Sequence, residues 1–527
     1  MSLAAGTFTI NEGSIIRLNK PVTLRGAGPT ATFLTRTNGA QLGSYFPGSN
    51  QSELIRISGS SASGTTVALT ADAAQGSNSV QVSSAAGYSV GEIVLLDEAS
   101  GSGWQTDRVN PSTEKIWASP DYRVVWNIHN PPMGGDDGAP AIYSYFQAHS
   151  DHPTNEMHQI SAISGNTITF DSPITISYRV SHGAQLTPML TGPTNAGVEQ
   201  LAVKGGDNGN IRFETAAYAW AKDIDSSYWL NEGFAINSSF RVQLEGIYIH
   251  DAVWPSPGGG GYAISFAFGS SEDLIENSIS MRANKVVVAR SSGTGSVIAY
   301  NYMDDGFIYG SDGWQEIGLN ASHLVGSHHV LFEGNYGFNI DSDQTHGNSI
   351  YHTFFRNYVS GYRRAFTDYL NNVVIDDINN KPGGNGPLRA AAAHAYAYWF
   401  SFIGNVLGTT GYTSGWTYNC IGGRNYIPSD CIWELGWVDI SPQGYDPNTA
   451  ATAIQDGNYD YLTNTIQWAS NDSARTLPNS LYLSGKPAFF NAGSGYNWPW
   501  VNPTGSPQLY TLPAKARYDA GTPFTQP

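Results

Sequence analysis

Apolar and polar residues alternate in short stretches along most of this chain, and the same kind of stretch recurs. Each copy has an extended alternation, then an asparagine, then a second extended stretch, as in "SVIAYNYMDD" and "HVLFEGNYGF". Alternation with a period of two predicts β-strands, whereas a helix would repeat its apolar residues about every 3.6 positions. The recurring asparagines are Asn277, Asn301, Asn335, Asn357, Asn379 and Asn405.

The intervals between these asparagines predict the architecture. They are 24, 34, 22, 22 and 26 residues, so one structural turn takes 22–26 residues. This period predicts a parallel β-solenoid, in which each turn stacks on the next at about 4.8 Å and the asparagine side chains form a ladder at the corners. The interval of 34 is one turn with an extra loop of about ten residues, within "YGSDGWQEIGLNASHLVG".

The pattern also divides the chain. Residues 1–64 are predicted to form an N-terminal cap and the first turns, and residues 181–410 the main solenoid. Between them, residues 65–180 contain alternating stretches such as "NTITF" with Gly and Asn turns, which predicts an inserted β-rich subdomain. The period fades after residue 410, where Pro and aromatic residues become frequent, so residues 411–527 are predicted to form the last turns and a cap.

The segment "KPVTLRGAGPTATFL" and the asparagine-cornered turns resemble the right-handed parallel β-helix proteins of the pectate-lyase-like superfamily. The resemblance covers roughly residues 5–60 and 190–410. It implies an all-β fold, a right-handed parallel β-helix, to which the pattern adds a small β-barrel-like subdomain and an irregular C-terminal cap. The superfamily includes family 28 glycoside hydrolases and many polysaccharide lyases, so the resemblance implies a carbohydrate-active protein.

The net charge of the chain limits the kinds of partner that it is expected to bind. Lys and Arg number 26 and Asp and Glu 43, so the formal net charge is −17. This charge repels nucleic acid and anionic membrane surfaces, and we expect neither as a partner. It favours a neutral or weakly charged polysaccharide, bound by a monomer or by one part of a multidomain enzyme. No apolar run approaches the length of about 18 residues that spans a membrane.

The N-terminus and the two cysteines bear on the cellular compartment in which the protein is expected. The N-terminus "MSLAAGTFTI" lacks the basic and apolar regions of a signal peptide. We therefore expect a secreted, extracellular or periplasmic protein whose signal is absent from this chain. Cys420 and Cys431 flank a Gly- and Pro-containing loop, and the sequence leaves open whether they form a disulfide.

Several carboxylates stand just after the predicted corners. Asp304 and Asp305 follow Asn301, and Asp341 and Asp343 take nearly the same place after Asn335. Side chains on one face of successive turns form a row, so one or two turns can provide the separation of roughly 6.5–9.5 Å that inverting glycosidases require between two carboxyl groups. These residues are therefore candidate catalytic acids and bases.

Family 28 hydrolases carry an Asp pair, then Gly-His-Gly, then a basic pair. This chain has Asp304-Asp305, then His346 within Thr-His-Gly, then Arg363-Arg364, in the same order but at longer spacing. The family's earlier Asn-x-Asp element has no clean counterpart. The resemblance implies that Asp304 and Asp305 are acid and base with His346 assisting. The alternative is that corner Asp and His side chains bond to the local backbone.

Inserted loops offer candidate substrate-binding residues. "GSDGWQE" contains Trp314 and Glu316, the latter an alternative general acid. Aromatic rings present flat apolar faces on which sugars can stack, although the same rings could pack against the scaffold. The loop "IHDAVWPSPGGGGY" and the basic pair supply the other candidates, which are His250, Asp251, Trp254, Tyr262, Arg363 and Arg364.

The sequence thus predicts a glycoside hydrolase and leaves three alternatives. A non-catalytic β-helix module, for example one that binds xylan, would use the same aromatic and acidic residues. A polysaccharide lyase would use Arg356 with Arg363 and Arg364, and Ca²⁺ held by Asp341 and Asp343 would neutralise the substrate. A tail-spike-like adhesin is the last alternative. Apart from this Ca²⁺, no cofactor is expected.

Overall fold

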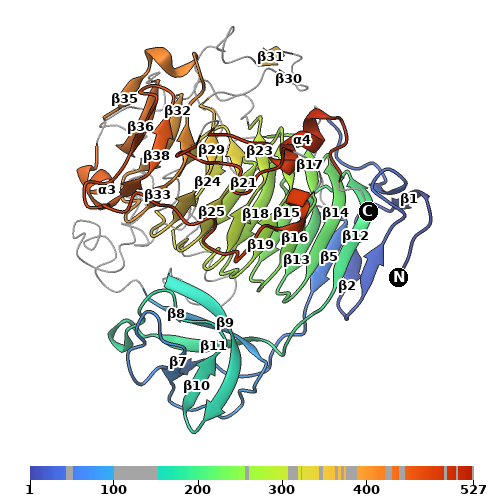
Figure 1. The fold of residues 1–527 in the computed structure, drawn as a ribbon. Helices are drawn as coiled ribbons and strands as arrows, with labels where there is room; N and C mark the ends of the chain where they lie inside the picture. The colour runs from blue at the N-terminus through green and yellow to red at the C-terminus, as the bar shows by residue number, and fades with distance from the viewer. Residues whose placement is uncertain are drawn as a thin grey trace.

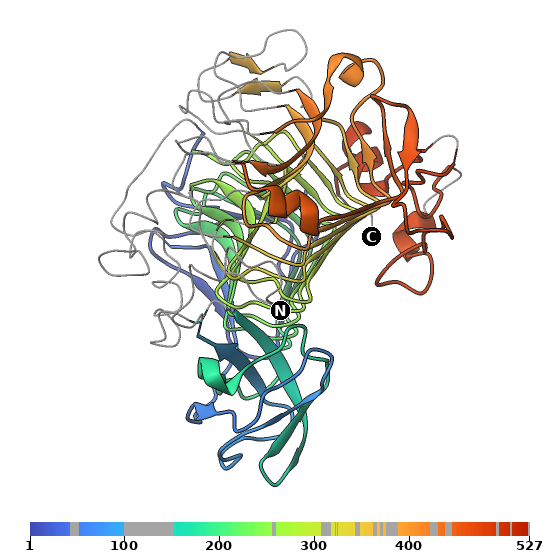
Figure 2. The ribbon, with the colours of Figure 1, turned by 90° about the vertical axis from the view of Figure 1, so that its left-hand side faces the viewer.

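Three long parallel sheets wind around one apolar interior in the computed structural model (Figure 1). Successive turns contribute strands to the three sheets in the same order, so the chain is a parallel β-helix, which confirms the predicted fold class. Viewed along the axis, the turns overlie one another (Figure 2). The structure describes residues 1–42, 52–99, 152, 154–255, 260–306, 318–321, 323, 325–342, 348–361, 366–368, 373–375, 388–421, 430–437, 445–491, 495–505 and 508–524.

The first and second sheets meet at the asparagine corner, and β12 and β14 run through this corner from one sheet into the other. The first sheet contains β3 (Thr23–Arg25), β12 (Gly197–Lys204), β14 (Trp220–Ser227), β16 (Gln243–Glu245), β19 (Leu274–Glu276), β22 (Val297–Ala299), β25 (Leu331–Glu333), β28 (Thr353–Phe355), β33 (Ser401–Ile403) and β37 (Ile454–Asp456). The second contains β1 (Gly6–Ile10), β4 (Thr32–Arg36), β17 (Tyr248–His250), β20 (Ile279–Met281), β23 (Tyr302–Asp304), β26 (Tyr336–Gly337), β29 (Tyr358–Val359), β34 (Val406–Leu407), β38 (Asn458–Asp460) and β39 (Thr465–Gln467).

The third sheet closes the cross-section of the β-helix. It contains β2 (Ile16–Leu18), β5 (Ile55–Ser58), β13 (Gly209–Glu214), β15 (Glu232–Asn237), β18 (Tyr262–Ala267), β21 (Val287–Arg290), β24 (Leu319–Asn320), β27 (Ile340–Asp341), β32 (Arg389–His394), β36 (Cys431–Trp437) and β35 (Thr417–Asn419). The short helices are α3 (Pro447–Thr452), α4 (Pro513–Asp519) and the 3₁₀ turns Val180–His182, Thr413–Gly415 and Ala488–Asn491. None of the helices among the described residues is long and apolar enough to cross a membrane.

The predicted asparagine ladder is present at the corner between the first and second sheets. The side-chain amide of Asn301 donates to Oδ1 of Asn335 at 3.0 Å, and Asn335 donates likewise to Asn357 at 3.0 Å. Asn357 donates to Asn405 at 3.1 Å, and Asn405 to Asn458 at 3.0 Å. Each amide therefore satisfies its neighbour inside the protein, where an unpaired polar group would be costly.

Two expectations about the ladder are wrong. Asn357 bonds directly to Asn405, and β28 pairs with β33, so Asn379 is not a corner between them. Asn379 itself lies outside the described residues. The segment before it contains a hairpin, β30 (Phe366–Asp368) with β31 (Val373–Ile375), which belongs to an excursion from the repeat. Asn277 is not in the ladder either, because the N–H of Ser278 donates to Oδ1 of Asn301, and the side chain of Asn277 accepts from Arg517 instead. Beyond Asn405, Asn458 adds another turn, within the region predicted to form the last turns.

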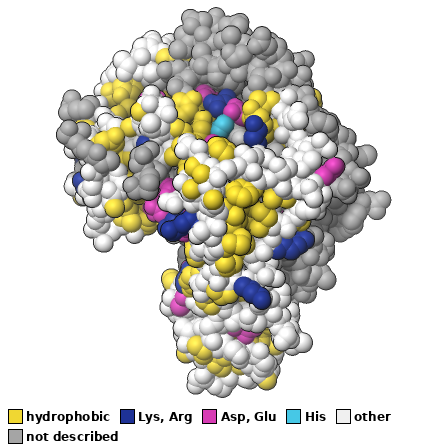
Figure 3. Space-filling model, turned by 90° about the vertical axis from the view of Figure 1, so that its right-hand side faces the viewer, with side chains coloured by type: hydrophobic (Ala, Val, Ile, Leu, Met, Phe, Trp, Pro, Cys, Tyr) yellow, Lys and Arg dark blue, Asp and Glu magenta, His cyan; other side chains and the backbone are white. Residues whose placement is uncertain are grey.

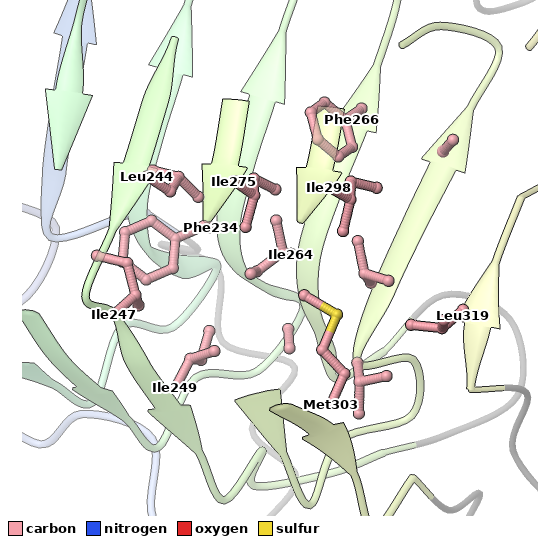
Figure 4. Packing of buried hydrophobic residues seen from close by; sticks show 14 of the residues in the cluster. Phe234, Leu244, Ile247, Ile249, Ile264, Phe266, Ile275, Ile298, Met303 and Leu319 are labelled. Carbon is pink, nitrogen blue, oxygen red and sulfur yellow. The ribbon is translucent and has the colours of Figure 1, made fainter. Parts of the chain in front are cut away.

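Rows of apolar side chains fill the interior. Leu244, Ile275 and Ile298 stand in register on successive strands of the first sheet (Figure 4). The same row continues to Phe332 and Phe354, whose rings stack with centroids 4.7 Å apart. Strict alternation along each strand sends these residues inward and their neighbours outward. The outward residues are therefore the ones available for function.

An antiparallel six-stranded sheet is inserted between β5 and β12. Its order is β6 (Val67–Ala68), β11 (Gln185–Leu190), β8 (Ile93–Glu98), β9 (Thr154–Ser164), β10 (Thr167–Phe170) and β7 (Ser79–Gln81). A bridge between Leu69 and Val82 brings the two edges together, as in a small barrel. The sheet extends to Leu190, ten residues beyond the end that the sequence predicts, because β11 pairs with both β6 and β8.

The C-terminal segment runs back along the asparagine corner. Trp500 donates its indole N–H to the carbonyl of Gly334, and Arg517 donates to Oδ1 and the carbonyl oxygen of Asn277. The segment thus covers turns that lie far from the C-terminal end of the β-helix. Figure 3 shows the N-terminal end of the molecule, where hydrophobic side chains gather and a histidine lies above them among acidic and basic groups.

Candidate functional site

Four of the described candidate residues lie where the second sheet turns into the third, namely His250, Asp251, Asp304 and Asp305. On β17, β20 and β23 the side chains of Ile249 and Met303 point into the core, so the alternate positions face outward. We call the outward group the corner site. It consists of Asp225, His250, Asp251, Arg282, Asp304 and Asp305.

Strand register aligns these residues in two rows. His250 pairs with Met281, and Met281 with Asp304, so His250 and Asp304 are two strands apart in one row. The residues that follow each strand, Asp251, Arg282 and Asp305, form the second row. All three have left-handed backbones, with φ of 63°, 51° and 55°. Two strand spacings are roughly 10 Å, so the structure brings together two pairs of candidates that are more than fifty residues apart in sequence.

Both ring nitrogens of His250 contact carboxylates. Nε2 lies 3.0 Å from Oδ1 of Asp225, and Nδ1 lies 2.5 Å from Oδ2 of Asp251. The ring stacks on Tyr248 with centroids 4.1 Å apart. Burial lowers the pKa of His250, but the hydrogen bonds to Asp225 and Asp251 outweigh it, and the net shift is upward. His250 therefore has no ring nitrogen left to bind a sugar hydroxyl directly.

Arg282 holds the second of these carboxylates. Its Nε donates to Oδ1 of Asp251, and its Nη2 donates to Oδ2 at 3.1 Å. Burial alone would raise the pKa of Asp251, but hydrogen bonds from His250 and Arg282 lower it well below its usual range. Asp251 is consequently ionised at every physiological pH. Its side chain is 17% exposed, as is that of Arg282, so this part of the site reaches solvent.

Asp304 and Asp305 are more deeply placed. Both side chains are buried, and Oδ1 of Asp304 accepts a hydrogen bond of 2.9 Å from the backbone N–H of Asp305. The carbonyl of Asp305 accepts from the N–H of Arg282, which ties the two turns together. This is the local backbone bonding that the alternative interpretation expects, and the catalytic role of the pair stays a prediction.

Trp254 lies near the corner site in a small apolar cluster. The cluster also contains Leu42, Tyr228 and Val253, and Trp254 is half-buried there. The ammonium group of Lys204 lies 4.1 Å from the centre of the Tyr228 ring. Tyr228 lies one turn before Asp251, since its N–H donates to the carbonyl of Asp251, whereas Trp254 follows Asp251 in the same turn.

Tyr262 lies away from the corner site, on the third sheet. Its hydroxyl contacts Nε2 of His323 at 2.9 Å, and the guanidinium of Arg290 lies 5.3 Å from its ring centre. The ring is buried, so it does not offer a face to a sugar in this structure. The sequence grouped Tyr262 with His250 because they share one loop, but that loop crosses from one sheet to the next.

Asp341 belongs to a separate buried network. Nε of Arg389 donates to Asp341 at 2.5 Å, and its Nη1 donates to Glu434 at 2.7 Å. Trp437 donates to the same aspartate at 3.3 Å, and its ring lies 4.2 Å from the guanidinium. Burial raises the pKa of Asp341 to about 6 although Arg389 opposes the shift. All these side chains are at most 3% exposed, and a substrate does not reach them without rearrangement.

Some of the candidate residues belong to parts of the chain that the structure does not describe. Asp343, His346, Glu316, Trp314, Arg363 and Arg364 lie outside the described residues. Arg356, a candidate of the lyase alternative, instead donates from its guanidinium to the carbonyls of Leu477, Pro478 and Val501.

Among the described residues no group of three or more His, Cys, Asp or Glu is arranged to hold a metal ion. Cys420 and Cys431 are not joined by a disulfide.

The residues that sequence reasoning missed are Asp225 and Arg282. A signal for both was present, since each stands at or just after a second-sheet strand, as His250, Asp251, Asp304 and Asp305 do. Arg389, Glu434 and Trp437 were also missed. They follow an irregular excursion, so their register with Asp341 could not be counted from the period.

Comparison with known proteins gives a likeness of fold alone. No protein-family model and no curated protein matches the chain. Solved structures that match include the tailspike protein gp49 from Pseudomonas phage LKA1, with a TM-score of 0.48 and 12% identity over 78% of this chain and 55% of that one. The gp54 tailspike of Acinetobacter baumannii bacteriophage AP22, in complex with capsular saccharide, has a TM-score of 0.48 and 10% identity over 89% of this chain and 62% of that one.

A third match is a family 28 exopolygalacturonase of Yersinia enterocolitica, with a TM-score of 0.25 and 10% identity over 82% of this chain and 69% of that one. This chain thus spans little more than half the length of the two tailspikes. Because all three TM-scores are below 0.5, the fold assignment rests on the strand pairing of this chain. No residue role is taken from these structures.

Proposed function

We propose that this protein binds a polysaccharide at the corner site and hydrolyses it there. The observation that carries the proposal is the alignment of Asp251, Arg282 and Asp305 on successive turns. Asp251 and Asp305 are two strand spacings apart, roughly 10 Å between backbones, which suits the roughly 6.5–9.5 Å between the carboxyl groups of inverting glycosidases. Asp305, with Asp304 beside it, supplies the acid, and Asp251 is the ionised partner.

The arrangement also suits an extended neutral or weakly charged glycan. A row of side chains along the β-helix axis can follow a long substrate, and Tyr228, whose N–H donates to the carbonyl of Asp251, extends the row by one turn. His250 and Arg282 balance the charges of Asp225 and Asp251, whereas the whole chain carries −17. Two of the compared structures have a saccharide or a polygalacturonase in their names. We propose the same broad class of substrate because of the corner residues, not because of that likeness.

A second candidate is a binding module without catalysis. It is favoured by the pairing of Asp251 with Arg282 and by the burial of Asp304 and Asp305. In such a module the ion network would hold the corner rigid, and the aromatic residues would provide the contacts with sugar. Both candidates predict retention of a polysaccharide, so only product formation separates them.

The test is a screen of neutral and weakly acidic polysaccharides, with reducing-sugar release, ultraviolet absorbance of unsaturated sugars and retention in affinity gels as readouts. For a substrate that is cleaved, D305N should lower the rate of sugar release by about 100-fold or more, because loss of a general acid or base costs that much. D519N is the matched control, since Asp519 is exposed and pairs only with Lys515 among the described residues.

Three results would change the assignment. Undiminished sugar release by D305N and D304N would exclude both residues as the acid. Unsaturated product would indicate a lyase. Retention in the gel without any product would establish the binding module.

A further inference from the structure

His250 lies between two carboxylates in a geometry that determines its protonation. Asp225 faces Nε2 at 3.0 Å, and Asp251 faces Nδ1 at 2.5 Å. A carboxylate is an acceptor only, whereas neutral imidazole carries one N–H, so both contacts are hydrogen bonds only when the ring is the doubly protonated cation. Removing one proton would leave a ring lone pair facing a carboxylate oxygen.

Every element packed around the ring contributes a group. Strand β14 contributes Asp225, β17 contributes Tyr248, Asp251 follows β17, and Arg282 follows β20. From the C-terminal segment, Tyr518 and Phe524 pack against the far side of Tyr248 at 6.5 and 5.8 Å between ring centres. Two cations thus face two anions at this corner. Loss of the imidazolium charge would leave a net negative corner that is only partly exposed to water.

The contacts also show what the cation connects. Asp225 is 25 residues before His250 and belongs to the preceding turn, while Arg282 is 31 residues beyond Asp251 and belongs to the next. The imidazolium therefore joins one turn directly to its neighbour and orients the carboxylate that Arg282 clamps. Charge-assisted hydrogen bonds of this kind are roughly twice as strong as neutral ones.

We propose that His250 is a pH-dependent latch of the corner site, which as imidazolium joins β14 to β17 and positions Asp251 for the glycan, and which releases both when it loses its proton. The inference rests on the proposed function in so far as a glycan occupies this corner. His250 is a positioning residue, because its ring nitrogens contact aspartates and not the substrate.

The direction of the effect follows from the linkage between charge and structure. Hydrogen bonds to the two aspartates outweigh burial and raise the pKa of His250 above its ordinary value of 6.5. A group with a raised pKa in the folded state stabilises it fully below the unfolded pKa, and this contribution is lost as the pH rises through the folded pKa. The latch is therefore closed at low pH and opens as the pH rises through the pKa of His250.

The first experiment tests the latch without a glycan. The full-length protein is labelled at its histidine ring carbons, and the His250 signal is assigned by its absence from H250Q. We expect this signal to titrate above pH 6.5, and D225N to move its midpoint down by about one unit or more, since one stabilising carboxylate is gone. A midpoint at or below 6.5 in the wild type, or an unchanged midpoint in D225N, overturns the proposal.

The second experiment measures retention of a bound polysaccharide between pH 5 and pH 9. Wild-type affinity should fall through the same midpoint that the ring signal shows, and H250Q should bind weakly at all pH values without that transition. H182Q is the control, because His182 belongs to the inserted subdomain and contacts Glu98 there. Circular dichroism checks that each variant is folded.

The outcomes separate the two proposals. A glycan affinity that does not change at the His250 midpoint overturns the latch and leaves the proposed function intact. A wild-type protein that retains no polysaccharide at any pH overturns the proposed function and the role of the latch in it. The ring titration then still decides whether His250 is the doubly bonded cation.

Discussion

At the scale of single residues, two aspartates differ in how their surroundings shift the pKa of the side chain. Asp251 directly follows β17 and Asp273 directly precedes β19, yet their surroundings shift the two pKa values in opposite directions. Hydrogen bonds from His250 and Arg282 lower the pKa of Asp251, whereas burial raises the pKa of Asp273 well above its ordinary value. The difference is the number of donors, because Asp273 accepts one hydrogen bond, from the N–H of Val242 at 2.8 Å, and within the described residues its Oδ2 has no partner.

We therefore expect D273N to stabilise the protein at neutral pH. The amide keeps the oxygen that accepts from Val242 and removes a charge that burial disfavours. Because the folded state holds the proton more tightly, the wild type gains stability as the pH falls, by up to about 1.4 kcal/mol per pH unit for one proton. Denaturant unfolding at pH 7.5 and pH 4.5 should show an advantage of D273N that shrinks in acid. An advantage independent of pH would contradict this explanation, and D519N should show no advantage at either pH.

At the scale of elements, the asparagine ladder determines how one turn is attached to the next. Each amide donates to the asparagine of the next turn and to a backbone carbonyl, as Asn357 does to Asn405 and Phe332. The oxygen of Asn357 in turn accepts from the N–H and the side chain of Asn335. One side chain thus completes four hydrogen bonds inside the protein, so its removal leaves several buried groups without partners.

Replacing Asn357 by Ala should cost about 2–5 kcal/mol of unfolding free energy, because each buried group left unpaired costs about 1–3 kcal/mol. Equilibrium denaturation measures this directly. N502A is the control, since Asn502 belongs to a surface turn, where its oxygen accepts only from Thr504 among the described residues. Equal losses in the two variants would mean that the ladder adds nothing beyond an ordinary turn.

At the scale of the whole molecule, the C-terminal segment connects turns that are distant along the axis. Arg356 donates to three carbonyls of this segment, and Arg517 binds the corner residue Asn277. Burial lowers the pKa of both arginines to about 10, although Glu333 opposes the shift at Arg356 and Asp223 opposes it at Arg517. The segment covers the tyrosines of the second sheet, and Tyr518 and Phe524 reach Tyr248 beside the corner site.

We expect R356M to loosen residues 477–501 while the β-helix stays folded. Three carbonyls lose a charged donor, whereas the methionine keeps most of the apolar contact of the side chain. Hydrogen exchange of this segment should become at least about tenfold faster, which corresponds to about 1.4 kcal/mol. R475M is the matched control, since Arg475 is exposed. Exchange that is unchanged in R356M would show that the apolar contacts alone hold the segment.

The sequence alone determined the repeat, the asparagine corners at Asn301, Asn335, Asn357 and Asn405, and the placement of acidic residues beside strand ends. These follow from alternation and from the residues required at a corner, both of which are local. The sequence could not determine which residues of different turns lie side by side. That depends on how many residues each turn spends in its loops, and the step from Asn357 directly to Asn405 shows how an excursion breaks the count. The pairing of His250 with Asp225 and of Asp251 with Arg282 was therefore decided only by the tertiary structure, because stacking brings residues of different turns into contact.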